Sequence, residues 1–112
     1  MMSRLALAWM ITCLPNIAQA ELEATFLRYT CERAVQIPVV YAKSGDDAIA
    51  VLTVEGGQFL LYSQPTTSGA RYGWPSDGSN YVWLTEGAGA KLLWRDGATK
   101  AETTLLAACT QN

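Results

Sequence analysis

The chain has 112 residues, with 8 lysines and arginines against 10 aspartates and glutamates, and it contains no histidine. The lack of histidine excludes Ser–His and Cys–His nucleophilic pairs, and the mild negative charge disfavours nucleic acid as a partner. The length suffices for one domain with one modest core. These bounds favour a small binding protein without a cofactor over an enzyme.

Residues 1–20 have the composition of a secretory signal peptide. Arg4 is followed by an apolar run from Leu5 to Leu14, and Ala18-Gln19-Ala20 supplies a small-x-small cleavage signal. The apolar run is too short to span a bilayer, and no later segment is long and apolar enough to do so. We therefore expect one mature domain, residues 21–112, in the periplasm.

The three cysteines fall on both sides of this cleavage signal. Cys13 raises the alternative of a lipid anchor, but Thr12 is a poor residue for the position before a lipidated cysteine, so a free periplasmic protein is expected. Cys31 and Cys109 remain in the mature chain, and in an oxidising compartment they predict one disulfide. Such a bond closes a long loop, which the chain-entropy model values at about 4–5 kcal/mol.

Short runs of β-branched and aromatic residues, separated by turn residues, recur along the mature chain. They predict about eight strands, at 24–31, 35–42, 47–54, 58–63, 71–74, 79–86, 90–95 and 103–109. Leu27, Tyr29 and Cys31 alternate within the first strand and are expected to face inward. Pro38 predicts an edge position or a bulge in the second strand. Because no segment has the pattern of an amphipathic helix, the spacing favours a barrel or a sandwich.

The stretch from Ser63 to Trp74, with the sequence SQPTTSGARYGW, lies between two of these strands. Pro65 ends the preceding strand, and the small polar residues after it predict a loop. Gly69 permits a turn with positive φ, which would leave the Ser68 hydroxyl facing outward. Two interpretations stay open at this point, an ordinary turn of an all-β domain and a tip that docks into a cleft.

The same loop carries a resemblance to a known family. Its sequence TSGARY, together with Tyr29-Thr30-Cys31 upstream and the late Cys109, resembles the signature of the MliC/PliC family of bacterial c-type lysozyme inhibitors. The family loop has the form S-x-SGAxY, in which Thr66 replaces the first serine. The remaining positions match at Ser68, Gly69, Ala70 and Tyr72.

This resemblance implies a small eight-stranded antiparallel β-barrel closed by one disulfide, with an interior filled by side chains and no large ligand cavity. It also implies a periplasmic inhibitor that inserts the Thr66–Tyr72 loop into the active-site cleft of a c-type lysozyme. Ser68 would contact the catalytic carboxyl groups, and Tyr72 would brace the base of the loop. The implied lysozyme-binding residues are Thr66, Thr67, Ser68, Gly69, Ala70, Arg71, Tyr72 and Glu86.

Two of these residues have a second interpretation. Arg71 could pair with a carboxylate of the enzyme or with an acidic side chain of its own barrel. Glu86 stands where the family usually has a lysine, at the end of an aromatic strand, so one charge is reversed. The reversal predicts weaker inhibition, a different range of lysozymes, or a compensating cation at Lys91 or Arg71.

Other classes of function are weighed against this one. Trp74, Trp83 and further aromatic residues could bind a glycan, although aromatics at strand spacing usually pack in the core. Asp46-Asp47 has the composition of a solvated turn rather than of a metal site, and no carboxylate cluster has metal-ligand spacing. Pairing of two copies through a strand edge stays open.

Overall fold

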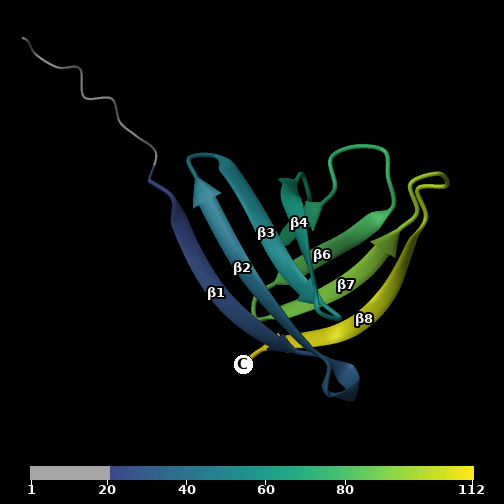
Figure 1. The fold of residues 1–112 in the computed structure, drawn as a ribbon, viewed down its shortest axis with the longest axis horizontal. Coiled ribbons are helices and arrows are strands. Elements are labelled where there is room, and N and C mark those ends of the chain that lie inside the picture. Colours follow the sequence, from purple (N-terminus) through teal and green to yellow (C-terminus); the bar gives the residue numbers. More distant parts are fainter. Residues whose placement is uncertain (1–20) are drawn as a thin grey trace, which may run out of the picture.

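A computed structural model describes residues 21–112, which form eight antiparallel strands closed into one barrel (Figure 1). The strands are β1 (Glu23–Thr30), β2 (Gln36–Ser44), β3 (Asp47–Val54), β4 (Gly57–Gln64), β5 (Ala70–Gly73), β6 (Asn80–Glu86), β7 (Gly89–Arg95) and β8 (Glu102–Gln111). Each strand pairs with the next, and β8 returns to pair with β1. The predicted all-β barrel is therefore confirmed.

The strands lie close to the predicted positions. β3 has the bounds expected from the sequence, and the turn before β4 places Glu55 and Gly56 at φ values of 50° and 81°. β2 continues to Ser44, two residues into the predicted turn, because its last residues pair with the start of β3. Within residues 21–112, no helix has the length and apolar character that crossing a membrane requires. The predicted signal peptide and Cys13 lie outside the described residues.

The expectation that Pro38 marks an edge strand or a bulge is wrong, because the ladders of β2 with β1 and with β3 show no register shift. β2 is flanked by β1 on one side and β3 on the other, so it is not an edge strand of the barrel. Pro38 pairs with Arg28 of β1, whereas the register with β3 begins only at Val39. Because proline lacks an N–H, its place beyond the end of the β2–β3 ladder avoids the loss of a ladder hydrogen bond.

The core contains a group of aromatic side chains with satisfied polar ends. Tyr29 and Cys31 are buried and Leu27 packs against the same cluster, as the alternation in the first strand predicts. Trp83 is fully buried and donates its indole N–H to the Tyr41 hydroxyl at 2.8 Å, and this hydroxyl lies 2.8 Å from that of Tyr29. Burial raises the pKa of Tyr41. These hydrogen bonds permit polar atoms in the core without the cost of leaving them unpaired.

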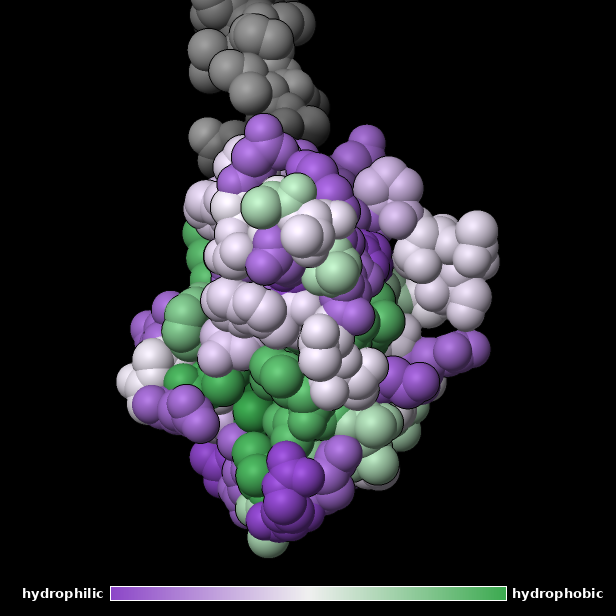
Figure 2. Space-filling model, turned by 90° about the vertical axis from the view of Figure 1, so that its right-hand side faces the viewer, coloured by the Kyte–Doolittle hydropathy of each residue, from purple (hydrophilic) through white to green (hydrophobic). Residues whose placement is uncertain are grey.

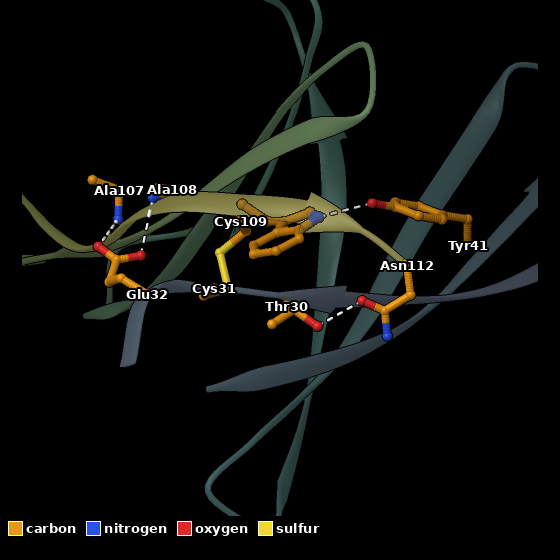
Figure 3. Close-up of a disulfide and its surroundings, with 9 residues drawn as sticks. Thr30, Cys31, Glu32, Tyr41, Ala107, Ala108, Cys109 and Asn112 are labelled. Atoms are coloured by element: carbon orange, nitrogen blue, oxygen red, sulfur yellow. Dashed lines mark hydrogen bonds between the residues drawn. A yellow bond between two sulfur atoms is a disulfide. The ribbon is translucent and has the colours of Figure 1, made fainter. Parts of the chain in front are cut away.

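The seam that closes the barrel has few backbone pairs. β1 and β8 pair only at Tyr29–Gln111 and Thr30–Thr110. The Cys31–Cys109 disulfide joins the two strands beside these pairs, which confirms the predicted bond (Figure 3). Closure of the barrel therefore depends on side chains as well as on the ladder.

Glu32 makes a second connection at this seam. It lies in the short 3₁₀ turn η1 (Glu32–Ala34), and its carboxylate accepts hydrogen bonds from the backbone N–H groups of Ala107 and Ala108 at 2.7 and 3.0 Å (Figure 3). These two hydrogen bonds lower the pKa of Glu32. The Glu32 carboxylate thus accepts hydrogen bonds from the two residues of β8 that directly precede Cys109.

Apolar side chains also lie on the outer surface of the barrel. Phe26, Val40, Val51 and Leu60 are direct cross-strand partners on β1 to β4, and Phe26 is 59% exposed. On the side that carries the β7–β8 connection, hydrophobic atoms gather in one area bordered by hydrophilic residues (Figure 2). The barrel therefore exposes apolar area on more than one side.

Candidate functional site

The loop between β4 and β5 stands out from the barrel as an exposed segment. All five residues from Pro65 to Gly69 are exposed, and the Thr66 hydroxyl donates to the Ser68 carbonyl oxygen at 3.2 Å. This hydrogen bond across the tip gives the loop a defined shape. The predicted loop is therefore present, with the Ser68 side chain at its surface.

Gly69 joins this loop to the end of β6. Its φ is +64°, and a Cβ atom at this position would lie 2.1 Å from the carbonyl oxygen of Thr85. The next residue, Ala70, is the cross-strand partner of Thr85. Only glycine allows this close approach together with this backbone angle, so the loop lies directly against β6.

The approach brings Ser68 to Glu86, the last residue of β6. The Ser68 hydroxyl donates to a carboxylate oxygen of Glu86 at 3.4 Å, and both residues are exposed. Sequence reasoning placed both residues in the site but did not predict this contact, because 18 positions separate them. The reversed charge therefore lies beside the proposed contact residue.

A surface hollow of about 390 Å³ opens beside the loop. Its wall combines the loop with the adjoining parts of β6, β7 and β8. It contains Lys91, and of the predicted site residues it includes Thr66, Thr67, Ser68, Ala70 and Glu86. The hollow lies at the surface beside the loop, whereas the middle of the barrel is filled by the core cluster, as expected for a barrel of this size.

Arg71 is engaged within the barrel. Its guanidinium donates to the Gln64 side chain at 2.9 Å and forms an ion pair with Glu102 of β8. The hydrogen bond from Arg71 lowers the pKa of Glu102. Of the two interpretations of Arg71, this arrangement corresponds to pairing with an acidic side chain of its own barrel.

Tyr72 lies beneath the loop rather than on it. Its ring packs against Tyr41, with ring centroids 5.6 Å apart, and it contacts the core cluster. Burial raises the pKa of the Tyr72 hydroxyl. Because Tyr72 faces inward and strand side chains alternate, the neighbouring Arg71 faces outward.

The aromatic residues divide between the interior and the surface. Trp83 is fully buried, so it cannot take part in a glycan platform, and this part of the glycan alternative is wrong. Tyr62 and Trp74 are each 38% exposed, with ring centroids 5.9 Å apart. They are the aromatic pair that a surface ligand could reach on this side.

Metal binding has little support in the described part of the chain. Residues 21–112 contain no group of three or more Cys, Asp or Glu side chains placed to hold an ion. The acidic side chains of Asp77 and Glu102 instead pair with Lys100 and Arg71. The geometry around the loop is that of a binding surface built from hydroxyls, backbone groups and two charges of opposite sign.

Comparison with protein families matches residues 29–101 to the family described as membrane-bound lysozyme-inhibitor of c-type lysozyme. The inhibitor of that name from Pseudomonas aeruginosa is 32% identical over 81 residues, which cover 70% of this chain and 61% of the relative. The chain therefore spans less than two thirds of that relative's length.

Solved structures share the fold. The crystal structure of Pseudomonas aeruginosa MliC in complex with hen egg white lysozyme superposes with a TM-score of 0.63, at 22% identity, covering 98% of this chain and 100% of that one. PliC from Salmonella typhimurium, a periplasmic lysozyme inhibitor of c-type lysozyme, gives a TM-score of 0.66 at 20% identity. This match covers 80% of this chain and 99% of that one. At sequence identities this low, the structural similarity shows that the barrel fold is shared.

Proposed function

Because this chain belongs to the family of membrane-bound inhibitors of c-type lysozyme, we propose that it binds a c-type lysozyme and blocks its active-site cleft with the Thr66–Tyr72 loop. The family is one of inhibitors, so we assign the chain no catalytic activity. A location in the periplasm, where such an inhibitor would protect peptidoglycan, agrees with the predicted signal peptide and with the periplasmic relative.

The observation that carries the proposal is the exposed, braced loop with the Ser68 hydroxyl at its tip. A c-type lysozyme uses a protonated glutamic acid and an ionised aspartate on either side of the scissile bond. A hydroxyl can donate to one carboxyl and accept from the other, and backbone groups at Gly69 and Ala70 can approach closely. The loop would satisfy both carboxyl groups while it excludes the sugar.

The structure supports different roles for the remaining site residues. Thr66 holds the tip through its bond to the Ser68 carbonyl, and Tyr72 packs beneath the loop against Tyr41. Lys91 is exposed, lines the hollow beside the loop, and supplies a cation that the enzyme's acidic cleft would attract. Since Arg71 is already paired, we assign the compensating positive charge to Lys91.

The test is lysis of bacterial cell walls by hen egg white lysozyme in the presence of the oxidised protein, expressed from the full chain. Dose-dependent loss of lysis is expected, and Ser68→Ala should raise the inhibitory concentration about tenfold, since one charge-assisted hydrogen bond contributes about 1.5 kcal/mol. Ser76→Ala makes the same change in the exposed turn after Trp74 and should inhibit like wild type. Equal inhibition by the Ser68 and Ser76 variants would refute the loop mechanism.

A second candidate is a noncatalytic envelope module that binds a glycan or another protein. The exposed pair of Tyr62 and Trp74 favours it. Titration with soluble peptidoglycan fragments would change the tryptophan fluorescence of such a module, and Trp74→Ala would abolish the change. Inhibition of lysozyme without any fluorescence response to glycan selects the inhibitor.

A further inference from the structure

The contact between Ser68 and Glu86 places a carboxylate next to the hydroxyl at the tip of the loop. The serine hydroxyl lies 3.4 Å from a carboxylate oxygen of Glu86. The backbone fixes this proximity, because Gly69 lies against Thr85 and Ala70 pairs with Thr85 across the strands. Any group that binds the Ser68 hydroxyl therefore comes close to Glu86.

The distances limit how far apart these groups can lie. A carboxyl oxygen of the partner that bonds the Ser68 hydroxyl would lie about 2.8 Å from it. Because a Glu86 oxygen lies 3.4 Å from the same hydroxyl, the two carboxyl oxygens are separated by at most about 6 Å. Two ionised carboxylates at this separation repel each other strongly once water is excluded.

The charged groups around Glu86 do not remove this repulsion. In the hollow, the loop contributes only hydroxyls and backbone groups, and β8 contributes Ala107 and the disulfide-bonded Cys109. Lys91 of β7 is the one cation in this lining, and within residues 21–112 the ion pairs are Arg71–Glu102 and Lys100–Asp77, so Lys91 is not paired with Glu86. Lys91 must also serve the acidic cleft of the partner.

We infer that binding of the lysozyme favours the protonated form of Glu86, which then donates to the Ser68 oxygen while the Ser68 hydroxyl donates to a catalytic carboxylate of the lysozyme, and that Glu86 thereby makes inhibition stronger in acid than at neutral pH. The inference rests on the proposed function, because it requires a partner that presents carboxyl groups to Ser68. The added proton replaces the repulsion between two carboxylates by a chain of two hydrogen bonds through the Ser68 hydroxyl. Glu86 would thus set the pH range of the inhibitor rather than simply weaken it.

The experiment measures the Kd for hen egg white lysozyme from about pH 4 to about pH 8, by calorimetry in two buffers of different ionisation enthalpy. Titration of the enzyme's carboxyl groups in the free enzyme is common to all variants, so a difference between wild type and Glu86→Gln, which mimics the protonated side chain, reports the effect of Glu86. Wild type should take up more protons on binding than this variant, by about half a proton at the pH where the difference between their Kd values changes most steeply. At about pH 8 the variant should bind about tenfold more tightly, and the difference should shrink as the pH falls toward about pH 4, where an ordinary glutamate is already largely protonated.

Glu55→Gln is the matched control, because it removes the same charge at an exposed turn that the whole length of β4 separates from the loop. The Kd of this variant should depend on pH as that of wild type does, and its proton uptake on binding should be the same. If the Kd values of wild type and Glu86→Gln depend on pH in the same way, the inference is overturned, while binding itself still supports the proposed inhibitor function. Weaker binding of Glu86→Gln at every pH also overturns it, since Glu86 would then pair with a cation of the enzyme. Failure of wild type to bind at any pH overturns both the inference and the proposed function.

Discussion

Arg71 of β5 is paired with Glu102 of β8, although β6 and β7 lie between their strands. Both side chains therefore extend over the outer face of the two intervening strands. On that face Val82 and Leu93 are direct cross-strand partners, and they are buried although they do not belong to the interior cluster. The ion pair and the apolar pair beneath it tie the base of the loop to the last strand.

Removal of this ion pair should lower the stability of the barrel and, at the same time, release the base of the loop from β8. Arg71→Met and Glu102→Gln should each reduce the free energy of unfolding by about 1 kcal/mol, because the pair is partly screened by solvent. Chemical denaturation of the two single variants and the double variant measures the loss of unfolding free energy in each. The loss in the double variant should be smaller than the sum of the two single losses. Additive losses would mean that the two residues act independently.

Gly69→Ala should reduce inhibition by more than tenfold while the barrel stays folded. The new Cβ would lie 2.1 Å from the Thr85 carbonyl oxygen, and alanine at φ +64° is strained, so the tip must move away from β6. Inhibition of lysis and the circular dichroism spectrum are measured side by side. Gly56→Ala has a similar backbone angle with nothing within 4 Å, so it isolates the effect of strain and should inhibit normally.

Removal of the disulfide should destabilise the protein strongly. The bond joins residues 78 positions apart, and the chain-entropy model gives about 4.5 kcal/mol for a loop of this length. Urea denaturation of a Cys31→Ser/Cys109→Ser double variant measures the loss directly. A loss below about 1 kcal/mol would show that the reduced chain already holds its ends together.

Glu32→Gln should weaken the seam in a pH-dependent way. Because hydrogen bonds from the N–H groups of Ala107 and Ala108 lower the pKa of Glu32 below its ordinary value of 4.5, its carboxylate stabilises the folded state above that pH. This contribution is lost as the pH falls through the lower pKa of the folded state. The difference in Tm between wild type and variant should be largest near neutral pH and should shrink below about pH 4. A constant difference across this range would contradict the assignment.

Much of the barrel follows from local sequence pattern. The bounds of β3, the turn at Glu55-Gly56 and the inward face of Tyr29 and Cys31 follow from alternation and turn residues. The loop after Pro65 follows in the same way. These features depend on neighbours in the chain, so a single sequence is enough to predict them.

The contacts that define the candidate site depend on register between distant strands. Ser68 meets Glu86 because Ala70 pairs with Thr85, and Arg71 meets Glu102 across two strands. The burial of Val82 on the outer face has the same origin. Strand pairing decides these contacts, and alternation within one strand carries no information on it.

The two-pair seam between β1 and β8 has a consequence for how the protein matures. A chain without the disulfide has its first and last strands linked by two residue pairs and by a few hydrogen bonds. Glu32 accepts from Ala107 and Ala108, Asn112 accepts from Thr30 at 2.6 Å and donates its N–H to the Arg28 carbonyl at 2.9 Å, and the Gln111 side chain donates to the Tyr29 hydroxyl at 3.4 Å. Before oxidation both strands can present unpaired edges to other chains. We therefore expect that oxidation of Cys31 and Cys109 keeps the first and last strands together in the newly made protein, and that a cell that lacks its thiol-oxidising machinery yields this barrel mainly as insoluble material.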